Sequence, residues 1–196
     1  MTVESDLRAG YLELQTAVVG DVLDEMGWRK QIFPWQIQAL VRGTKLFGQA
    51  FTVIGETIDD PDEDDNAARV AMISNVTPDS IAVVSSGDNH TAAHWGEITG
   101  LAARNAGCLG AVCDGGARDV GQLIRHGFPL FAKFRTPAAS TGRWSMRTWQ
   151  KQITVGDVAV NPGDYILGDD DGVVAIPRAL GVEVLEKAET KAETER

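Results

Sequence analysis

Three side chains near the middle of the chain have the types and the spacing to act together on a small acid. Arg118 and Asp119 are adjacent, and twenty residues separate them from Glu97. Asp119 offers a hard oxygen ligand of the kind that Mg²⁺ and Mn²⁺ prefer. The planar guanidinium of Arg118 matches a carboxylate or a keto oxygen. Glu97 falls in the first turn of a predicted helix, where the backbone N–H groups of residues 96–99 favour an anion. These groups predict a site for a metal ion and an anionic substrate.

The surrounding segments are expected to bring these residues to one edge of a sheet. Residues 96–106 carry apolar side chains at helical spacing, and 109–113 form a short apolar run typical of a buried parallel strand. The chain becomes polar at 114–119, which predicts a loop at the carboxyl end of that strand, where open α/β sheets bind ligands. A parallel βαβ arrangement is completed by predicted strands at 81–85 and 129–133 and by a helix at 119–126.

Several motifs occur in an order that resembles one protein family. Glu97, twenty residues and then Arg118–Asp119 are similar to the D-x20-R-D signature of class II pyruvate aldolases of the RraA-like family. Those enzymes are the 4-hydroxy-4-methyl-2-oxoglutarate / 4-carboxy-4-hydroxy-2-oxoadipate aldolases. Further blocks resemble the family along nearly the whole chain, at 16–23, 87–89, 94–97, 114–115, 161–164 and 169–174.

The resemblance implies both a fold and an activity. The implied fold class is α/β: a layered α/β/β swivelling-domain sandwich with a parallel βαβ core and a β-rich C-terminal part. The implied activity is that of a divalent-metal-dependent carbon–carbon lyase, which cleaves a 4-hydroxy-2-oxo di- or tricarboxylic acid to pyruvate and a second oxo acid. Oxaloacetate decarboxylation is a second expected activity, because it forms the same enolate. Family members assemble as homotrimers or homohexamers, with the active site at a subunit boundary.

By the same resemblance, Arg118, Glu97 and Asp119 are the catalytic residues and Asp119 is the ligand of Mg²⁺ or Mn²⁺. Glu97 stands where the motif has aspartate, as a metal ligand through water or as a proton carrier. Asp88 is another candidate for a metal ligand through water. The central block has no lysine for a Schiff base, which favours the metal route. The residues expected to bind the 2-oxo acid are Gly96, Glu97, Ile98, Thr99 and Arg118.

Simpler roles for these residues stay open. Arg118 and Asp119 could be a surface ion pair at a helix start, which contributes little, and Glu97 could simply cap its helix. The family also includes a non-catalytic regulator that binds a protein partner such as a ribonuclease, although a binding-only member has no need of a metal ligand. A methyltransferase or a dinucleotide-binding enzyme is not supported, because the chain lacks a glycine-rich cofactor loop.

The histidines give weaker signals. His90 and His94 flank the predicted site, and His94 could form a wall of its pocket. His126 precedes Gly127 at a helix end, which is typical of a C-terminal capping residue. The spacing of these residues does not predict a zinc site.

Composition excludes some partners. The formal charge is −10, and six acidic residues lie in 59–65, which we interpret as a solvated loop. A strongly acidic chain repels nucleic acid. No apolar run is long enough to span a membrane and no leader is evident, so we expect a cytoplasmic protein. Cys108 and Cys113 are interpreted as reduced core thiols.

The rest of the chain predicts one domain over residues 1–196. We expect helices at 3–14 and 16–26, with Thr16 as the N-cap of the second, and strands within 38–55 and from 153 to 176. Residues 187–196 have few apolar side chains and are expected to fray. Aromatic residues in segments without periodicity are candidates for a subunit interface: Trp28, Phe33, Trp35, Trp144 and Trp149.

Overall fold

Four parallel strands form the centre of the fold. The computed structural model describes residues 3–61 and 65–194. In the order in which they pair, the central strands are β6 (Leu130–Arg135), β5 (Gly110–Ala117), β3 (Ser80–Ser85) and β2 (Leu46–Thr57). Their apolar residues are buried on both faces, as expected for parallel strands covered on both sides.

Further strands extend this sheet. Within the described residues it has nine strands, and a separate hairpin lies against it. The antiparallel additions are β10 (Tyr165–Asp169) on β2, β11 (Gly172–Ile176) on β10, β7 (Trp144–Trp149) on β2 and β1 (Gln38–Ala39) on β6. The short strand β4 (Ala93–Trp95) pairs in parallel with β5. The hairpin consists of β8 (Ile153–Val155) and β9 (Val158–Val160).

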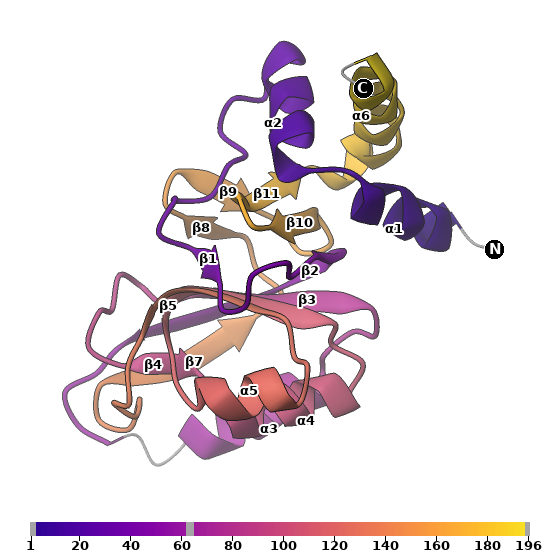
Figure 1. The fold of residues 1–196 in the computed structure, drawn as a ribbon. Coiled ribbons are helices and arrows are strands. Elements are labelled where there is room, and N and C mark those ends of the chain that lie inside the picture. Colours follow the sequence, from indigo (N-terminus) through magenta and orange to yellow (C-terminus); the bar gives the residue numbers. More distant parts are fainter. Residues whose placement is uncertain (1–2, 62–64, 195–196) are drawn as a thin grey trace.

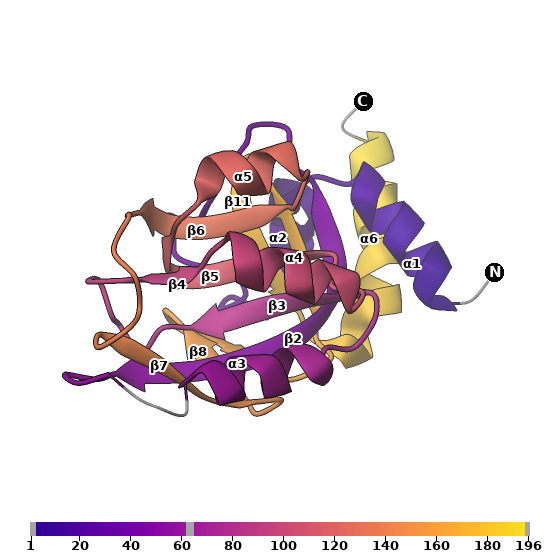
Figure 2. The same ribbon diagram turned by 90° about the horizontal axis from the view of Figure 1, so that it is seen from below.

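Helices cover the sheet in two groups (Figure 1). One face carries α3 (Asp65–Ser74), α4 (Glu97–Asn105) and α5 (Val120–Arg125), with α4 between the other two (Figure 2). The second group lies beyond β10 and β11 and consists of α1 (Val3–Glu13), α2 (Thr16–Glu25), the 3₁₀ turn Arg178–Leu180 and α6 (Gly181–Thr194). Across the described ranges, no helix combines the length and the apolarity that a membrane span requires.

The large sheet curls until its two ends are joined through the segment before β1. The N–H of Phe33 donates to the carbonyl of Val173 at 2.9 Å, and the N–H of Ala175 donates to the carbonyl of Gln31 at 2.8 Å. Ile32 forms a β-bridge with Val174 between these two bonds. Residues 31–33 therefore connect the β11 end of the sheet to the β1 end.

This curl separates three apolar clusters. The first lies between the central strands and α3–α5, the second inside the curl with β8 and β9, and the third under α1, α2 and α6. Large buried side chains anchor each cluster: Trp95 in the first, Phe131 in the second and Tyr11 in the third. The layered α/β architecture with a parallel core and a β-rich C-terminal part is confirmed.

The polar stretch 114–119 was predicted as a loop, and this is wrong for its first four residues. Strand β5 continues through Ala117 and is buried along its whole length. Glycine explains the difference, because a Cβ on Gly115 would lie 2.3 Å from His94 Nδ1 and one on Gly116 would lie 2.5 Å from the Ala92 carbonyl oxygen. The glycines that resembled a turn instead let β4 approach β5 closely.

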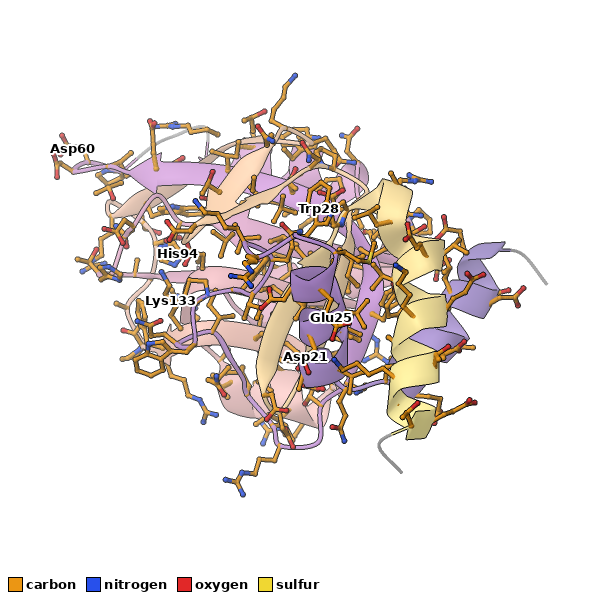
Figure 3. All side chains as sticks on the ribbon, turned by 90° about the horizontal axis from the view of Figure 1, so that it is seen from above. Asp21, Glu25, Trp28, Asp60, His94 and Lys133 are labelled. Carbon is orange, nitrogen blue, oxygen red and sulfur yellow. The ribbon has the colours of Figure 1, made fainter. Side chains whose placement is uncertain are left out.

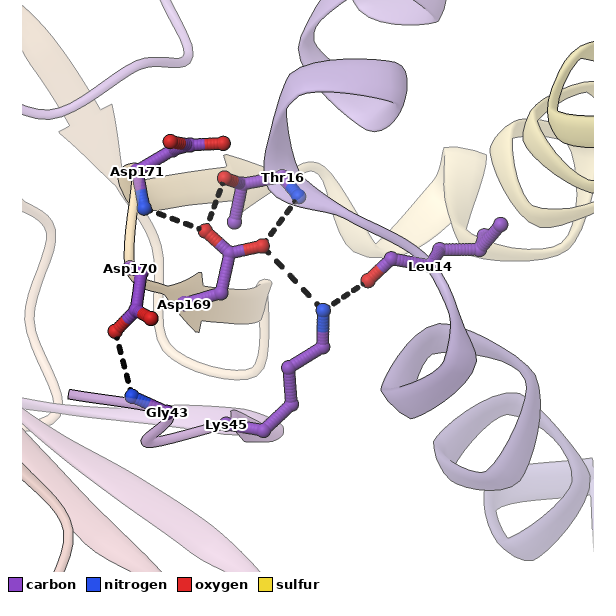
Figure 4. A network of polar contacts seen from close by, with 7 residues as sticks. All are labelled: Leu14, Thr16, Gly43, Lys45, Asp169, Asp170 and Asp171. Carbon is purple, nitrogen blue, oxygen red and sulfur yellow. Dashed lines mark hydrogen bonds and ion pairs between the residues drawn. The ribbon is translucent and has the colours of Figure 1, made fainter. Parts of the chain in front are cut away.

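The predicted N-cap of α2 is also wrong, because Gln15 occupies that position and Thr16 is the first helical residue. The hydroxyl of Thr16 donates to Asp169 Oδ1 at 2.6 Å and its N–H donates to Asp169 Oδ2 at 2.8 Å (Figure 4). Lys45 also bonds to Asp169, and its ammonium donates to the carbonyl of Leu14 as well. A carboxylate from the last residue of β10 thus caps a helix near the other end of the chain.

The C-terminal segment does not fray where the structure describes it. Helix α6 continues to Thr194, Ala188 is fully buried and Ala192 packs against the third cluster. Lys191 Nζ lies 2.6 Å from a carboxylate oxygen of Glu25 and 3.5 Å from one of Asp21. Both acids are on α2 beside α6 (Figure 3), so pairing with a neighbouring helix compensates for the charged composition.

Some expectations for single residues are confirmed and others are not. Cys108 and Cys113 are free and buried, as predicted. Asp59 and Asp60 are exposed, whereas residues 62–64 of the acidic run lie outside the described residues. Phe33 and Trp144 were predicted at an interface, but they are buried in the chain's own clusters. Trp144 lies in a strand, 144–149, that sequence periodicity did not reveal, and Phe33 lies in the segment that bonds to Val173.

Candidate functional site

A cleft of about 210 Å³ opens at the N-terminal end of α4, on the helix-covered face of the sheet. Its floor is β4, and the start of α4 forms one side together with the residues that join β5 to α5. Helix α3 and residues 139–141 form the other side. The lining residues most relevant to binding are Asn66, Arg69, Gly96, Thr99, Arg118 and Asp119.

Asp119 is held in a fixed position at the edge of this cleft. Its backbone is left-handed, with φ 55° and ψ 30°, and it is the N-cap of α5. Asp119 Oδ2 accepts a hydrogen bond from Arg118 Nε at 3.1 Å and one from the N–H of Glu97 at 3.3 Å. The N–H of Arg118 donates to the carbonyl of Trp95 at 3.0 Å. A non-glycine residue in the left-handed region is strained and persists only where its surroundings hold it. These hydrogen bonds therefore define the position of the Asp119 carboxylate.

Glycine at position 96 makes this arrangement possible. Gly96 is the N-cap of α4 in an extended conformation and has no side chain to cap the helix. A Cβ at this position would lie 2.9 Å from Asp119 Oδ2 and 3.0 Å from Arg118 Cγ. Gly96, Ile98 and Thr99 line the cleft, so the first turn of α4 meets the same space as Arg118 and Asp119. The backbone N–H groups of a helix start favour an anion there.

Two predicted residues lie apart from the cleft surface. Glu97 Oε1 lies 3.4 Å from His126 Nε2, and the Glu97 side chain is not among those that line the cleft. Asp88 is 87% exposed and pairs with His90 Nε2 at 3.0 Å. The predicted residues that the structure brings together in the cleft are Gly96, Ile98, Thr99, Arg118 and Asp119. Glu97 contacts this group through its backbone N–H, whereas Asp88 does not line the cleft.

His94 forms a wall of the cleft, as the sequence suggested. Its Nδ1 accepts from the N–H of Gly116 at 3.0 Å, so Nε2 carries the proton and donates to Asn89 Oδ1 at 3.2 Å. Burial, followed by the positive charges of Arg69 and His90, lowers the pKa of His94 to about 4. The ring is neutral at pH 7, so its role in the cleft is that of a rigid wall. His126 is the C-cap of α5, as predicted.

Sequence reasoning missed the α3 side of the cleft. Arg69 Nη2 donates to Ser140 Oγ at 2.8 Å, and the guanidinium carbon lies 5.6 Å from the centre of the Trp144 ring. Asn66 lies one helical turn earlier and also lines the cleft. The spacing of 66 and 69 places both on one face of a helix. That spacing was the signal available in the sequence. It indicates a binding role only once the fold is known to place α3 beside α4.

The lysines nearest to the site in sequence do not line the cleft. Lys133 on β6 forms a buried ion pair with Asp114 on β5, and burial raises the pKa of Asp114 although Lys133 opposes this. Figure 3 labels Lys133 and His94, which lie on β6 and β4, two strands that both pair with β5. Lys45 is engaged with Asp169 at 3.3 Å, in the network that caps α2. Within the described part of the chain, the cations that line the cleft are therefore arginines.

Comparison with known proteins agrees with this fold. A protein of Halalkalibacterium halodurans named "Putative 4-hydroxy-4-methyl-2-oxoglutarate aldolase" is 30% identical over 96% of this chain and 84% of its own length. A crystal structure described as novel cellulases from microbes associated with the gut ecosystem has a TM-score of 0.94 at 31% identity, over 99% of this chain and 87% of that one. RraAS2 of Streptomyces coelicolor, described as an unusual member of the RNase ES inhibitor RraA family, has a TM-score of 0.86 at 24% identity and covers 100% and 96% of the two chains, which supports the fold alone.

A family profile gives the broadest match. The profile described as RraA-like, Aldolase/RraA, matches residues 16–175, from the first residue of α2 to the last strand of the sheet. That range includes every residue named above as lining the cleft. On the strength of this match and of the shared fold, the chain belongs to the RraA-like (Aldolase/RraA) family.

Proposed function

We propose that this protein is a metal-dependent carbon–carbon lyase that releases pyruvate from a 4-hydroxy-2-oxo acid. The observation that carries the proposal is the position of Asp119. Its carboxylate is held by Arg118 and by the N–H of Glu97, in a cleft that also meets the start of a helix. A metal-dependent lyase for 2-oxo acids needs a carboxylate to bind the metal ion. It also needs a guanidinium and the N–H groups of a helix start to bind the anionic substrate, and this cleft has all three.

The donor set suits a divalent cation that keeps most of its waters. Among the described residues, no cluster of three or more His, Cys, Asp or Glu side chains could enclose a metal, and Asp119 is the one carboxylate that lines the cleft. Mg²⁺ commonly binds through one or two carboxylates, with the rest of its ligands from water and substrate, and Mn²⁺ accepts the same oxygen donors. When bound at Asp119, the cation would act as a Lewis acid toward the keto oxygen of the substrate.

The chain's own residues have separate tasks in this proposal. The N–H groups at the start of α4 bind the carboxylate next to the keto group, with Gly96, Ile98 and Thr99 shaping that end of the cleft. Arg118 already donates from Nε to Asp119, so its terminal nitrogens are the groups that would bind the substrate. His94, being neutral, excludes water without competing for the proton. Release of pyruvate as an enolate also accounts for oxaloacetate decarboxylation as a second activity.

Glu97 is proposed as the proton carrier, and its present contact sets a condition on that role. Its carboxylate contacts His126, so it has to rotate toward the cleft before it can serve the substrate. It is longer than the aspartate of the family motif, which gives it the reach for that rotation. Asp88, exposed and paired with His90, is proposed only as a ligand through water.

A non-catalytic regulator that binds another protein is the second candidate. One surface feature favours it: Trp28, Ile32 and Trp35 are 45%, 57% and 78% exposed in one short segment. We refer to these three side chains, two tryptophans and one isoleucine, as the aromatic patch. Exposed large apolar side chains are typical of protein association surfaces. The same patch also fits self-assembly into a trimer or hexamer, which the lyase proposal expects.

The deciding experiment is a screen of pyruvate release from a panel of 2-oxo acids with Mg²⁺ or Mn²⁺. We expect activity that excess EDTA abolishes and that returns when the cation is restored. Asp119→Asn keeps the shape and tolerates the left-handed backbone, so its activity should fall by roughly 100-fold without a loss of folded structure. A wild-type protein inactive on the whole panel would refute the lyase, and activity undiminished in EDTA would refute the metal.

A further inference from the structure

Among the described residues, two of the three charged side chains that line the cleft are arginines, Arg69 and Arg118, and the third is Asp119. The chain as a whole carries a formal charge of −10. A divalent cation at Asp119 would add positive charge to the site. One guanidinium and a helix start are enough for the carboxylate beside the keto group. A second arginine at the same cleft therefore suits a ligand with a second anionic group.

Arg69 is positioned to bind such a group. Its side chain is half-buried, with Nη2 bonded to Ser140 Oγ at 2.8 Å and the guanidinium carbon 5.6 Å from the Trp144 ring centre. A cation over an aromatic ring is attracted to it, so these contacts restrict where the guanidinium can go. The positive charge of Arg69 also acts on His94 in the cleft wall, because it is one of the causes that lower the pKa of His94.

The two arginines approach from different sides of the cleft, Arg69 from α3 and Arg118 from the connection between β5 and α5. Helix α4 lies between α3 and α5 (Figure 2), and the cleft opens at its N-terminal end. Arg118 enters from the α5 side, whereas Arg69 enters from the α3 side beside Asn66. The cleft volume of about 210 Å³ is below the roughly 300–1,000 Å³ of pockets that hold drug-sized ligands. A short metabolite with an anionic group at each end fits both the size and the two cations.

We propose that Arg69 is a specificity-determining residue that binds the distal carboxylate of a 2-oxo dicarboxylic acid. This inference rests on the proposed function for the identity of the proximal end, where Arg118 and the start of α4 bind the 2-oxo acid group. Asn66 and Ser140 lie beside the distal carboxylate and complete its hydrogen bonding. The preference for a dicarboxylate over a monocarboxylate then resides mainly in the α3 side of the cleft.

The kinetic test compares two substrates that differ only at the distal end. These are 4-hydroxy-2-oxoglutarate, which ends in a carboxylate, and 4-hydroxy-2-oxopentanoate, which ends in a methyl group. Arg69→Met keeps the aliphatic stem over Trp144 and removes the charge. The ratio of kcat/KM for the first substrate to that for the second should fall at least tenfold, mainly through KM. Arg125→Met removes an exposed arginine of α5 outside the cleft and should leave the ratio unchanged.

A binding measurement separates this inference from the lyase proposal. 2-Oxoglutarate and 2-oxopentanoate have equal chain lengths and lack the 4-hydroxyl group needed for aldol cleavage. In calorimetric titrations with Mg²⁺, the wild type should bind 2-oxoglutarate at least tenfold more tightly, and Arg69→Met should bind both alike. That result in a protein without lyase activity would support Arg69 and refute only the lyase.

Three results would overturn the role of Arg69. The first is a wild-type protein that binds both acids equally or binds neither. The second is an Arg69→Met variant that keeps the wild-type preference for the dicarboxylate. The third is a variant, shown by circular dichroism to be folded, that loses affinity for both acids to the same extent, because such a loss indicates a structural role. In the last two cases lyase activity of the wild type on either substrate would leave the proposed function intact.

Discussion

Asp119 combines an unusual backbone conformation with the chemistry proposed for its side chain. Aspartate is among the few non-glycine residues that tolerate the left-handed region, since its short polar side chain can form local hydrogen bonds. The conformation points Oδ2 at Arg118 Nε and at the N–H of Glu97. Backbone strain is common at functional sites, and here it is accompanied by a defined carboxylate position. The same residue therefore starts helix α5 and sets the geometry of the cleft.

Arg118→Lys tests whether the planar guanidinium group of Arg118 is needed, because lysine keeps the positive charge and loses that group. Lysine has no nitrogen at the position of Nε, so it cannot hold Asp119 and bind the substrate at the same time. We expect kcat/KM for pyruvate release to fall by about tenfold or more, which is about 1.4 kcal/mol per decade. Arg125→Lys is the matched control on α5. Kinetics of Arg118→Lys within twofold of the wild type would place Arg118 outside the site.

At the level of single residues, the sequence predicted part of the cleft. Gly96, Arg118 and Asp119 belong to one continuous motif region, so their proximity follows from a helix, a strand and a short connection. The direction of the Glu97 side chain could not be read, because it depends on His126 at the far end of α5. Arg69 was missed for a similar reason, since its relevance depends on how α3 packs beside α4.

The elements of the central layer were the most predictable part of the fold. Buried parallel strands and amphipathic helices have strong periodicity, and the helix at 96–106 and the strands at 81–85 and 129–133 were located within a few residues. The two missed strands, β4 and β7, exist because they pair with distant partners, β5 and β2. Helix α6 was underestimated because its stability comes from α2 and the third cluster rather than from its own composition.

The Asp169 network fixes α2 and also predicts a pH dependence of stability. Burial alone would raise the pKa of Asp169, but bonds from Thr16 and Asp171 and the charge of Lys45 outweigh it and lower the pKa from its ordinary value of 3.8. A carboxyl group with a lowered folded-state pKa stabilises the protein fully above this ordinary value, and the contribution is lost as the pH falls through the folded value.

Asp169→Asn should therefore destabilise the protein in a pH-dependent way. At pH 7 the variant leaves Lys45 without its carboxylate partner and weakens the cap of α2, so we expect a loss of roughly 2–3 kcal/mol. The difference in unfolding free energy between wild type and variant should shrink below about pH 4. Urea titrations at pH 7 and pH 3.5 measure it. Asp171→Asn is the control, because it changes an exposed side chain and keeps the backbone N–H that bonds to Asp169. A difference that is equal at both pH values would contradict the role of the ionised carboxylate.

At the scale of the whole molecule, several exposed apolar side chains are available for contact with a partner surface. The aromatic patch is one group of them, and Ile98 is 79% exposed at the edge of the cleft. We expect a neighbouring subunit at the cleft to cover Ile98 and to contribute further acidic ligands for the metal ion. The proposed homotrimer or homohexamer thus accounts for an apolar residue beside an otherwise polar site.

The assembly prediction is that the protein in solution has a mass three or six times its chain mass of 21.1 kDa. Light scattering at micromolar concentration measures this mass. Trp35→Gln should shift the distribution toward smaller species, because Trp35 is the most exposed member of the aromatic patch. Val182→Gln alters an exposed apolar residue of α6 and should leave the mass unchanged. A fully active wild-type monomer would rule out a site shared between subunits.

The cap on α2 has a consequence for how the protein is made. Thr16 and the carboxylate that holds it are 153 residues apart in the chain. A ribosome that adds 5–20 residues per second needs about 8–30 s to travel that distance. During this interval Val19, Val22 and Leu23 have no β11 to cover them, since that strand is synthesised later still. Helix α2 is thus synthesised long before the strands that cover it, and its apolar face lacks that cover in the nascent chain throughout this interval.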